Sequence, residues 1–162
     1  MKRFLPLAFA ILALCLAACE REPSWIAEGS HERERAFFGV GKASGIRNPS
    51  LRRTMADAKA RGQIATRLDE FERALDKAVL AGMTTGSRAA DKGPPVEVFR
   101  DTQVERHLTS VQIVEHWTSR KGDEYARAKL ELSSVLEQLA KAPEPHATAA
   151  QAQAAFDELA KR

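Results

Sequence analysis

A long run of helical periodicity between residues 48 and 81 constrains the fold of this chain more than any other feature of its sequence. Asn48-Pro49-Ser50 is typical of a helix start, and Gly82 is suited to end the helix. Two apolar stripes follow one another at spacings of three and four residues, which indicates faces that pack against other elements. The stripes consist of Leu51, Met55, Ala58, Gly62 and Ala65, and of Ile64, Leu68, Phe71, Leu75 and Val79. We expect close packing through small side chains in the first half and packing through large side chains in the second.

Three further segments have strand patterns. Residues 37–46 (FFGVGKASGI) form a glycine-punctuated strand, and residues 111–117 read as a second one. Residues 124–132 alternate between apolar and polar side chains, which predicts a strand with one wet face in an antiparallel hairpin with residues 111–117. Residues 96–110 fit a helix or a strand, and both alternatives stay open. The order predicts an α+β fold, a small antiparallel-containing sheet covered on one face by the long helix.

The remaining segments complete the predicted domain organisation. Ser133-Ser134 is expected to cap a short helix that runs to Lys141, and an alanine-rich helix follows the prolines at 143 and 145. We therefore divide the chain into a signal peptide (1–18), a lipidated tether (19–36), an α+β domain (37–141) and a proline-delimited C-terminal helix (142–162). Within the tether, Trp25-Ile26 is alternatively the first contact of the domain. Residues 83–95 are predicted to be a turn-rich loop.

The N-terminus carries an export signal with a lipidation site. Lys2 and Arg3 precede an apolar stretch from Phe4 to Leu16, too short for a membrane span and typical of a secretory signal. It ends Leu16-Ala17-Ala18-Cys19, the lipobox pattern of bacterial lipoproteins, in which the cysteine receives the acyl chains. More than one acyl chain gives stable membrane attachment. By analogy with enteric lipoproteins, Glu20 after the cysteine favours the outer membrane over inner-membrane retention.

Charge and cysteine content exclude several classes of protein. Without Lys2 and Arg3, 23 basic residues remain against 22 acidic ones, a net charge of +1, so the charge balance does not indicate a nucleic-acid partner. Cys15 lies in the signal and leaves Cys19 alone, which excludes an intramolecular disulfide.

Several segments together resemble a known family of small outer-membrane lipoproteins. They are the surroundings of Trp25, residues 37–46, residues 48–54 (NPSLRRT), residues 56–61 (ADAKAR), and the hairpin with Trp117, Gly122 and Tyr125. The family is typified by the twenty-kilodalton lipoprotein of Helicobacter and the flagella-associated lipoprotein FlgP, and the resemblance covers roughly residues 25–139. It implies an α+β domain on an acyl anchor with a role in the cell envelope, which in FlgP is a ring around the flagellar motor. It implies no catalytic residues.

Motifs for catalysis, cofactors or metals are weak. The glycines at 39, 41 and 45 have the wrong spacing for a dinucleotide loop, so we interpret them as a bulge or a close approach of the Ala58 and Gly62 face of the helix. The four histidines, at 31, 107, 116 and 146, are scattered without metal-ligand spacing, and no nucleophile elbow is present. We predict no enzyme activity, no cofactor and no metal.

A basic cluster is the strongest candidate binding site. Seven basic residues and only Asp57 as an acid lie between residues 42 and 67, whereas the helix turns acidic after Leu68. Four cations share the helix face opposite the Leu51 stripe, namely Arg52, Arg53, Lys59 and Arg67. They are candidate ligands for anionic lipid or lipopolysaccharide headgroups, with a solvated face as the alternative.

These observations predict an outer-membrane, lipid-anchored, non-catalytic component of the cell envelope. We expect it to self-assemble or to bind a protein partner, with flagellar association implied by the resemblance. The alternative is a periplasmic module that binds anionic headgroups through the basic helix face.

Overall fold

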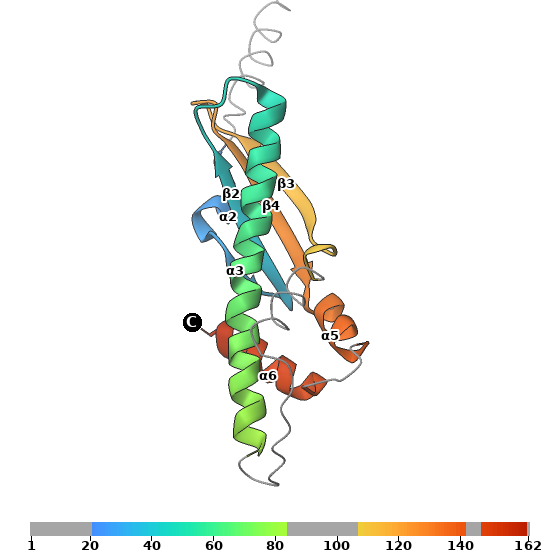
Figure 1. The fold of residues 1–162 in the computed structure, drawn as a ribbon. Coiled ribbons are helices and arrows are strands. Elements are labelled where there is room, and N and C mark those ends of the chain that lie inside the picture. Colours follow the sequence, from blue (N-terminus) through green and yellow to red (C-terminus); the bar gives the residue numbers. More distant parts are fainter. Residues whose placement is uncertain (1–20, 84–106, 142–146, 162) are drawn as a thin grey trace, which may run out of the picture.

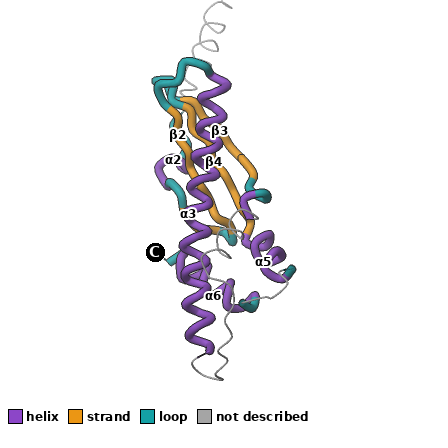
Figure 2. Tube along the Cα trace, in the orientation of Figure 1, coloured by secondary structure: helices purple, strands orange, loops and turns teal. Residues whose placement is uncertain are grey.

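The computed structural model describes residues 21–83, 107–141 and 147–161, and it has an α+β fold (Figures 1 and 2). The helices are α2 (Ser24–Glu28), α3 (Pro49–Met83), α5 (Leu132–Ala140) and α6 (Ala149–Leu159). The strands are β1 (His31–Arg33), β2 (Ala36–Ala43), β3 (Gln112–Thr118) and β4 (Glu124–Glu131). The predicted fold class is confirmed, as are the long helix and the antiparallel hairpin of β3 and β4.

The sheet has the order β1-β2-β4-β3, and each neighbouring pair is antiparallel. β2 and β3 therefore run parallel, and α3 is the crossover between them, with β4 inserted as the strand that both share. The two edges differ in length and regularity. β1 has only three residues, and the β3 ladder has a bulge between Ile113 and Glu115; both features discourage edge-to-edge pairing.

The core lies between the sheet and α3. Alternate residues of β4 face the helix, so Ala126, Ala128 and Leu130 are buried, as the period-two pattern predicts. Near the start of α3 the facing side chains are small, and farther along they are large. The large residues on α3 are Ile64, Leu68, Phe71 and Leu75. The second stripe predicted from the sequence is thus confirmed up to Leu75.

The first stripe was assigned to the wrong side of the helix. Leu51 and Met55 are exposed, and the residues that pack on the sheet are Ala56 and Ala60. The cause is β2, because a side chain on Gly41 would collide with the backbone at Ala56 and Ala60. Only alanine fits opposite the strand glycines at this distance, so the interpretation of these glycines as a close approach holds, but the helix face was wrong.

The predicted tether over residues 19–36 is wrong from Ser24 onward, and the alternative that Trp25 contacts the domain is right. Trp25 on α2 is buried, and β1 pairs with β2 in the register His31 to Phe38. The hydroxyl of Ser30 accepts a hydrogen bond of 3.0 Å from the amide of Val40. The fold therefore begins five residues after Cys19.

The C-terminal helix, predicted as a separate segment, belongs to the same core. The Phe156 ring packs edge to face on Phe37, with ring centroids 5.2 Å apart, and Leu159 is buried. Thr148 caps the helix through a reciprocal pair of bonds with Gln151. The predicted serine cap of α5 is wrong, because Glu131 occupies the N-cap position and no side chain caps the helix.

All of these elements and the buried core lie between Ser24 and Leu159. A chain of residues 20–162 therefore contains the whole described fold. Residues 83–110, predicted as a loop and then a helix or strand, lie mostly outside the described residues. At their end His107 and Leu108 are helical, and residues 109–110 form a turn.

Candidate functional site

The predicted lipidation site, Cys19, lies outside the described residues. None of the described helices is long and apolar enough to cross a membrane.

The four predicted anion-binding cations lie where α3 borders the sheet. The helix face opposite the Leu51 stripe is the face turned toward the strands, so these side chains extend along the edges of the helix–sheet packing. Each of them bonds to another part of the domain. Arg52 Nη1 donates to the Ile46 carbonyl at 3.1 Å, and Lys59 Nζ donates to the Lys42 carbonyl at 2.9 Å. They connect helix to sheet, and an anion-binding role for them stays a prediction.

Arg67 joins α3 to the segment that contains β1. Its Nη2 donates to the Ser30 carbonyl at 2.9 Å, its Nη1 lies 3.0 Å from Glu70 Oε2, and its Nε lies 3.6 Å from Glu32 Oε1. Burial raises the pKa of the Glu32 carboxyl, and the neighbouring Arg67 charge offsets part of that shift. A guanidinium with three partners has few donors left for a ligand.

Arg53 belongs to a three-residue network that fixes α3 to β3. Arg53 Nη2 lies 2.9 Å from His116 Nδ1, and His116 Nε2 lies 2.6 Å from Asp57 Oδ1. Because arginine only donates, Nδ1 accepts and Nε2–H donates to the carboxylate, so the imidazole is neutral in this arrangement. The network explains one histidine and one predicted cation as structural residues.

The outward face of α3 carries exposed apolar side chains. Leu51 is 52% exposed and Met55 39% exposed, and Ala58 and Gly62 continue the same face. One turn from the end of the helix Leu80 is 62% exposed. The apolar stripe that the sequence assigned to the core is therefore presented to solvent.

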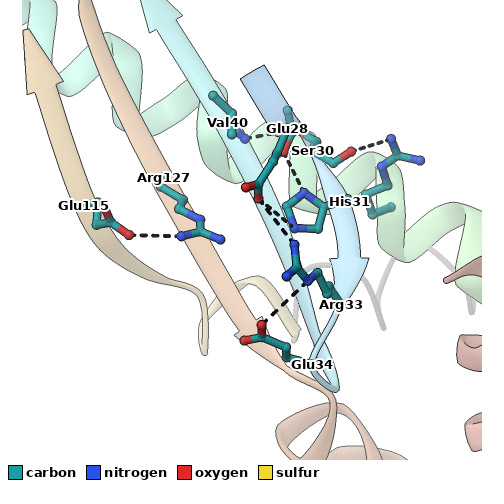
Figure 3. A network of polar contacts seen from close by, with 10 residues as sticks. Glu28, Ser30, His31, Arg33, Glu34, Val40, Glu115 and Arg127 are labelled. Atoms are coloured by element: carbon teal, nitrogen blue, oxygen red, sulfur yellow. Dashed lines mark hydrogen bonds and ion pairs between the residues drawn. The ribbon is translucent and has the colours of Figure 1, made fainter. Parts of the chain in front are cut away.

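A polar network surrounds a cavity of about 200 Å³ beside α2 and β1 (Figure 3). Glu28 lies 3.9 Å from His31 Nε2 and 3.8 Å from Arg33 Nη1, and Arg127 donates to Glu115 at 3.0 Å. The Arg127 guanidinium also lies 4.3 Å from the centroid of the Phe38 ring, a cation–π contact. Acids and cations pair with one another around this cavity, so its walls have little net charge with which to select an ion.

A second cavity, of about 420 Å³, lies between α5 and α6 and is lined by side chains such as Leu136, Leu139 and Thr148. Its lining is mostly apolar and brings no catalytic pair together. Among the described residues no group of three or more His, Cys, Asp and Glu side chains could hold a metal ion. His146 lies outside the described residues.

Sequence reasoning counted Lys42 among the basic residues but missed its ion pair at the end of the molecule where α3 begins. Lys42 Nζ lies 2.8 Å from Asp123 Oδ2, which joins the end of β2 to the β3–β4 turn. The hydrogen bond from Lys42 lowers the pKa of the Asp123 carboxyl, and the same bond raises the pKa of Lys42. The two residues are 81 positions apart in the sequence, so only the sheet register brings them together.

No protein-family model matches the chain, and no curated protein matches it.

Proposed function

We propose that this chain is a lipid-anchored, non-catalytic component of the outer membrane that associates with further copies of itself through the outward face of α3. The anchor part of the proposal is supported by the lipobox that ends at Cys19. Ser24 lies five positions after Cys19, and an extended chain of that length spans at most about 17 Å. A domain on so short a connection stays at the membrane surface.

The exposed face of α3 carries the association part of the proposal. Soluble domains bury helix stripes of the kind formed by Leu51, Met55, Ala58 and Gly62, and a continuous apolar stripe left in solvent marks an interaction surface. Confinement to a membrane surface favours association further, because it raises the effective concentration of the anchored chains.

The order of side chains along this face favours a second copy as the occupant. The stripe begins with two large residues and ends with small ones. An antiparallel pair centred on Ala58 therefore sets Leu51 opposite Ala65 and brings Met55 within one position of Gly62, large against small on both sides of the two-fold axis. The resemblance to flagella-associated lipoproteins also supports a structural role in an envelope assembly.

Sedimentation velocity of residues 20–162 over micromolar concentrations tests the association. We expect a discrete dimer or higher oligomer for the parent chain, and a monomer for Met55→Glu or Ala58→Glu, because each introduces a charge into the apolar face. Gln63→Glu is the matched control, since Gln63 is exposed on the same helix outside the stripe. A monomeric parent, or an oligomer unaffected by Met55→Glu, would refute this mode of assembly.

A further inference from the structure

Three segments that are distant in sequence meet at the end of the molecule where α3 begins, at the top of Figure 1. They are the end of β2 with residues 44–48, the first turns of α3, and the β3–β4 turn at residues 119–123. The Lys42–Asp123 ion pair joins the first to the third. Arg52 bonds to the Ile46 carbonyl, and its guanidinium lies near Gly122. We call this region the cationic tip.

The tip concentrates positive charge. Its six cations are Lys42, Arg47, Arg52, Arg53, Arg120 and Lys121. The two nearest carboxylates at this end are both engaged within the domain. Asp123 of the turn pairs with Lys42, and buried Glu124, the first residue of β4, accepts a 2.7 Å hydrogen bond from Thr118. The tip therefore keeps a strong excess of positive charge.

Three of these cations are presented to solvent, and two of them lie on a braced turn. Arg47, Arg120 and Lys121 are exposed, and none of them forms an ion pair within the described part of the chain. The turn that carries Arg120 and Lys121 is braced by bonds of 2.8 Å from the Gly122 amide to the Ser119 carbonyl and from the Ser119 amide to the Asp123 carbonyl. Gly122 has a φ of 81°, a conformation that favours glycine.

This placement of charge works against the helix that carries it. The first turn of α3 has no acidic residue, and Arg52 and Arg53 lie close to the positive end of the helix dipole. Each cation there lowers the stability of the helix. Residues that lower local stability are expected at positions that take part in binding or another function.

Charge is distributed with opposite signs along α3. Past Leu68 the helix carries four acids, namely Asp69, Glu70, Glu72 and Asp76, with Arg73 and Lys77 as the only cations among the described residues of that half. A domain that is positive at one end and acidic toward the other turns its positive end toward an anionic surface.

The anchor allows the tip to reach that surface. Ser30, two residues after α2, is hydrogen-bonded to Val40, which lies three residues before the end of β2, so Ser30 lies about 10 Å along the strand from the tip. A fully extended chain of the length from Cys19 to Ser24 spans at most about 17 Å. The tip and the predicted acyl chains therefore reach one membrane surface together.

We infer that the cationic tip docks on anionic phospholipid headgroups of the membrane that holds the anchor, with Arg47, Arg120 and Lys121 as the contacting side chains. The inference rests on the proposed function only for the identity of that membrane. It sets α3 at a steep angle to the bilayer and leaves the outward face of the helix accessible to a second copy.

Vesicle co-sedimentation of residues 20–162 tests the inference without the acyl chains. The probe is a vesicle of phosphatidylglycerol and phosphatidylethanolamine, with phosphatidylcholine vesicles as the zwitterionic comparison. We expect binding to the anionic vesicles only, and weaker binding as salt rises from about 0.01 M to 1 M, because the Debye length falls from about 30 Å to 3 Å. The triple variant Arg47→Gln, Arg120→Gln and Lys121→Gln should bind about a hundredfold more weakly.

A charge-matched control separates the tip from net charge. It combines Lys77→Gln, Lys141→Gln and Lys161→Gln, three exposed lysines on the far half of the molecule, and it should bind as the parent does. If the Gln tip variant loses its circular dichroism melting transition, single substitutions at Arg47 and Arg120 replace it, with a loss of about fivefold expected for each. Equal losses in tip and control variants, unchanged binding of the tip variant, or no binding by the parent would overturn the inference. Because this chain lacks Cys19, none of these results bears on the acyl anchor.

Discussion

The backbone of Gly41 lies directly against the first half of α3, with no room for a side chain between it and the carbonyl of Ala56. Gly39 lies in the same way against the carbonyl of Ala60. These two glycines set how closely the helix approaches the sheet, and through that distance they decide which face of α3 is buried.

Gly41→Ala should therefore destabilise the domain by about 1 to 3 kcal/mol, because an added methyl group must push helix and sheet apart. Gly62→Ala on the open face of the same helix should have the opposite sign and stabilise by about 0.5 to 1 kcal/mol, since nothing lies within 4 Å of its added Cβ. Urea denaturation of residues 20–162 measures both. Effects of the same sign would contradict the assignment of the buried face.

Phe156→Ala should destabilise the domain by about 3 to 5 kcal/mol, because the Phe156 ring fills the space between α6 and Phe37. Asp157→Ala, one residue along and exposed, should change the free energy of unfolding by less than about 0.5 kcal/mol. Denaturant titrations of the two variants give the comparison. Near-equal stabilities would mean that the C-terminal helix is an appendage and not part of the core.

Glu32 should make stability depend on pH in a direction opposite to that of a carboxyl whose pKa is lowered by an ion pair, such as Asp123. Burial raises its pKa above 4.5 in the folded state, so the stabilising effect of its proton is fully present below 4.5 and is lost as pH rises through the raised pKa. Glu32→Gln removes this dependence, and Arg67 keeps the Ser30 carbonyl and Glu70 as partners.

The checking measurement is the free energy of unfolding of parent and Glu32→Gln between pH 4.5 and pH 7. The parent should lose stability relative to the variant as pH rises across this range. A parent that gains stability relative to the variant would show that the pairing with Arg67 outweighs the burial of Glu32.

The sequence predicts the class of fold because apolar residues repeat at regular spacings in its long elements. The clearest case is the alternation of apolar and polar residues in β4. It does not identify the buried face at the start of α3, where the Met55 and Ala56 rows are both apolar or small. Which face is buried depends on which turn of α3 packs against Gly41, and that alignment of helix and strand is set by tertiary packing.

The first strand and its turn have even weaker sequence signals. β1 is the three-residue segment His31–Arg33, too short and too polar for a recognisable alternation. Its hairpin turns through Glu34 and Arg35 at φ values of 52° and 58°, where Asn-Gly is the usual pattern. The segment therefore reads as a charged tether, although its backbone completes the sheet.

In the candidate site, too, the sequence predicts the residues on one helix but not their contacts with other segments. Clustered cations on α3 are evident from the sequence, but the hydrogen bonds that hold Arg52, Lys59 and Arg67 are made to carbonyls of other segments. The cations of the β3–β4 turn join the tip only through the pairing of β4 with β2. The cluster of basic residues seen in the sequence therefore identifies only the part of the cationic tip from β2 to α3 and omits Arg120 and Lys121 of the β3–β4 turn.

Acylation of Cys19 is the claim on which the account of this protein depends, and metabolic labelling of the full chain with a palmitate analogue in an exporting bacterium tests it most directly. We expect label on the parent and on Cys15→Ser, because Cys15 lies within the predicted signal, and no label on Cys19→Ser, which should accumulate as an unprocessed precursor. The labelled protein should fractionate with the outer membrane. An unlabelled parent, or label that persists on Cys19→Ser, would contradict the lipid anchor and with it the proposed place of this domain in the envelope.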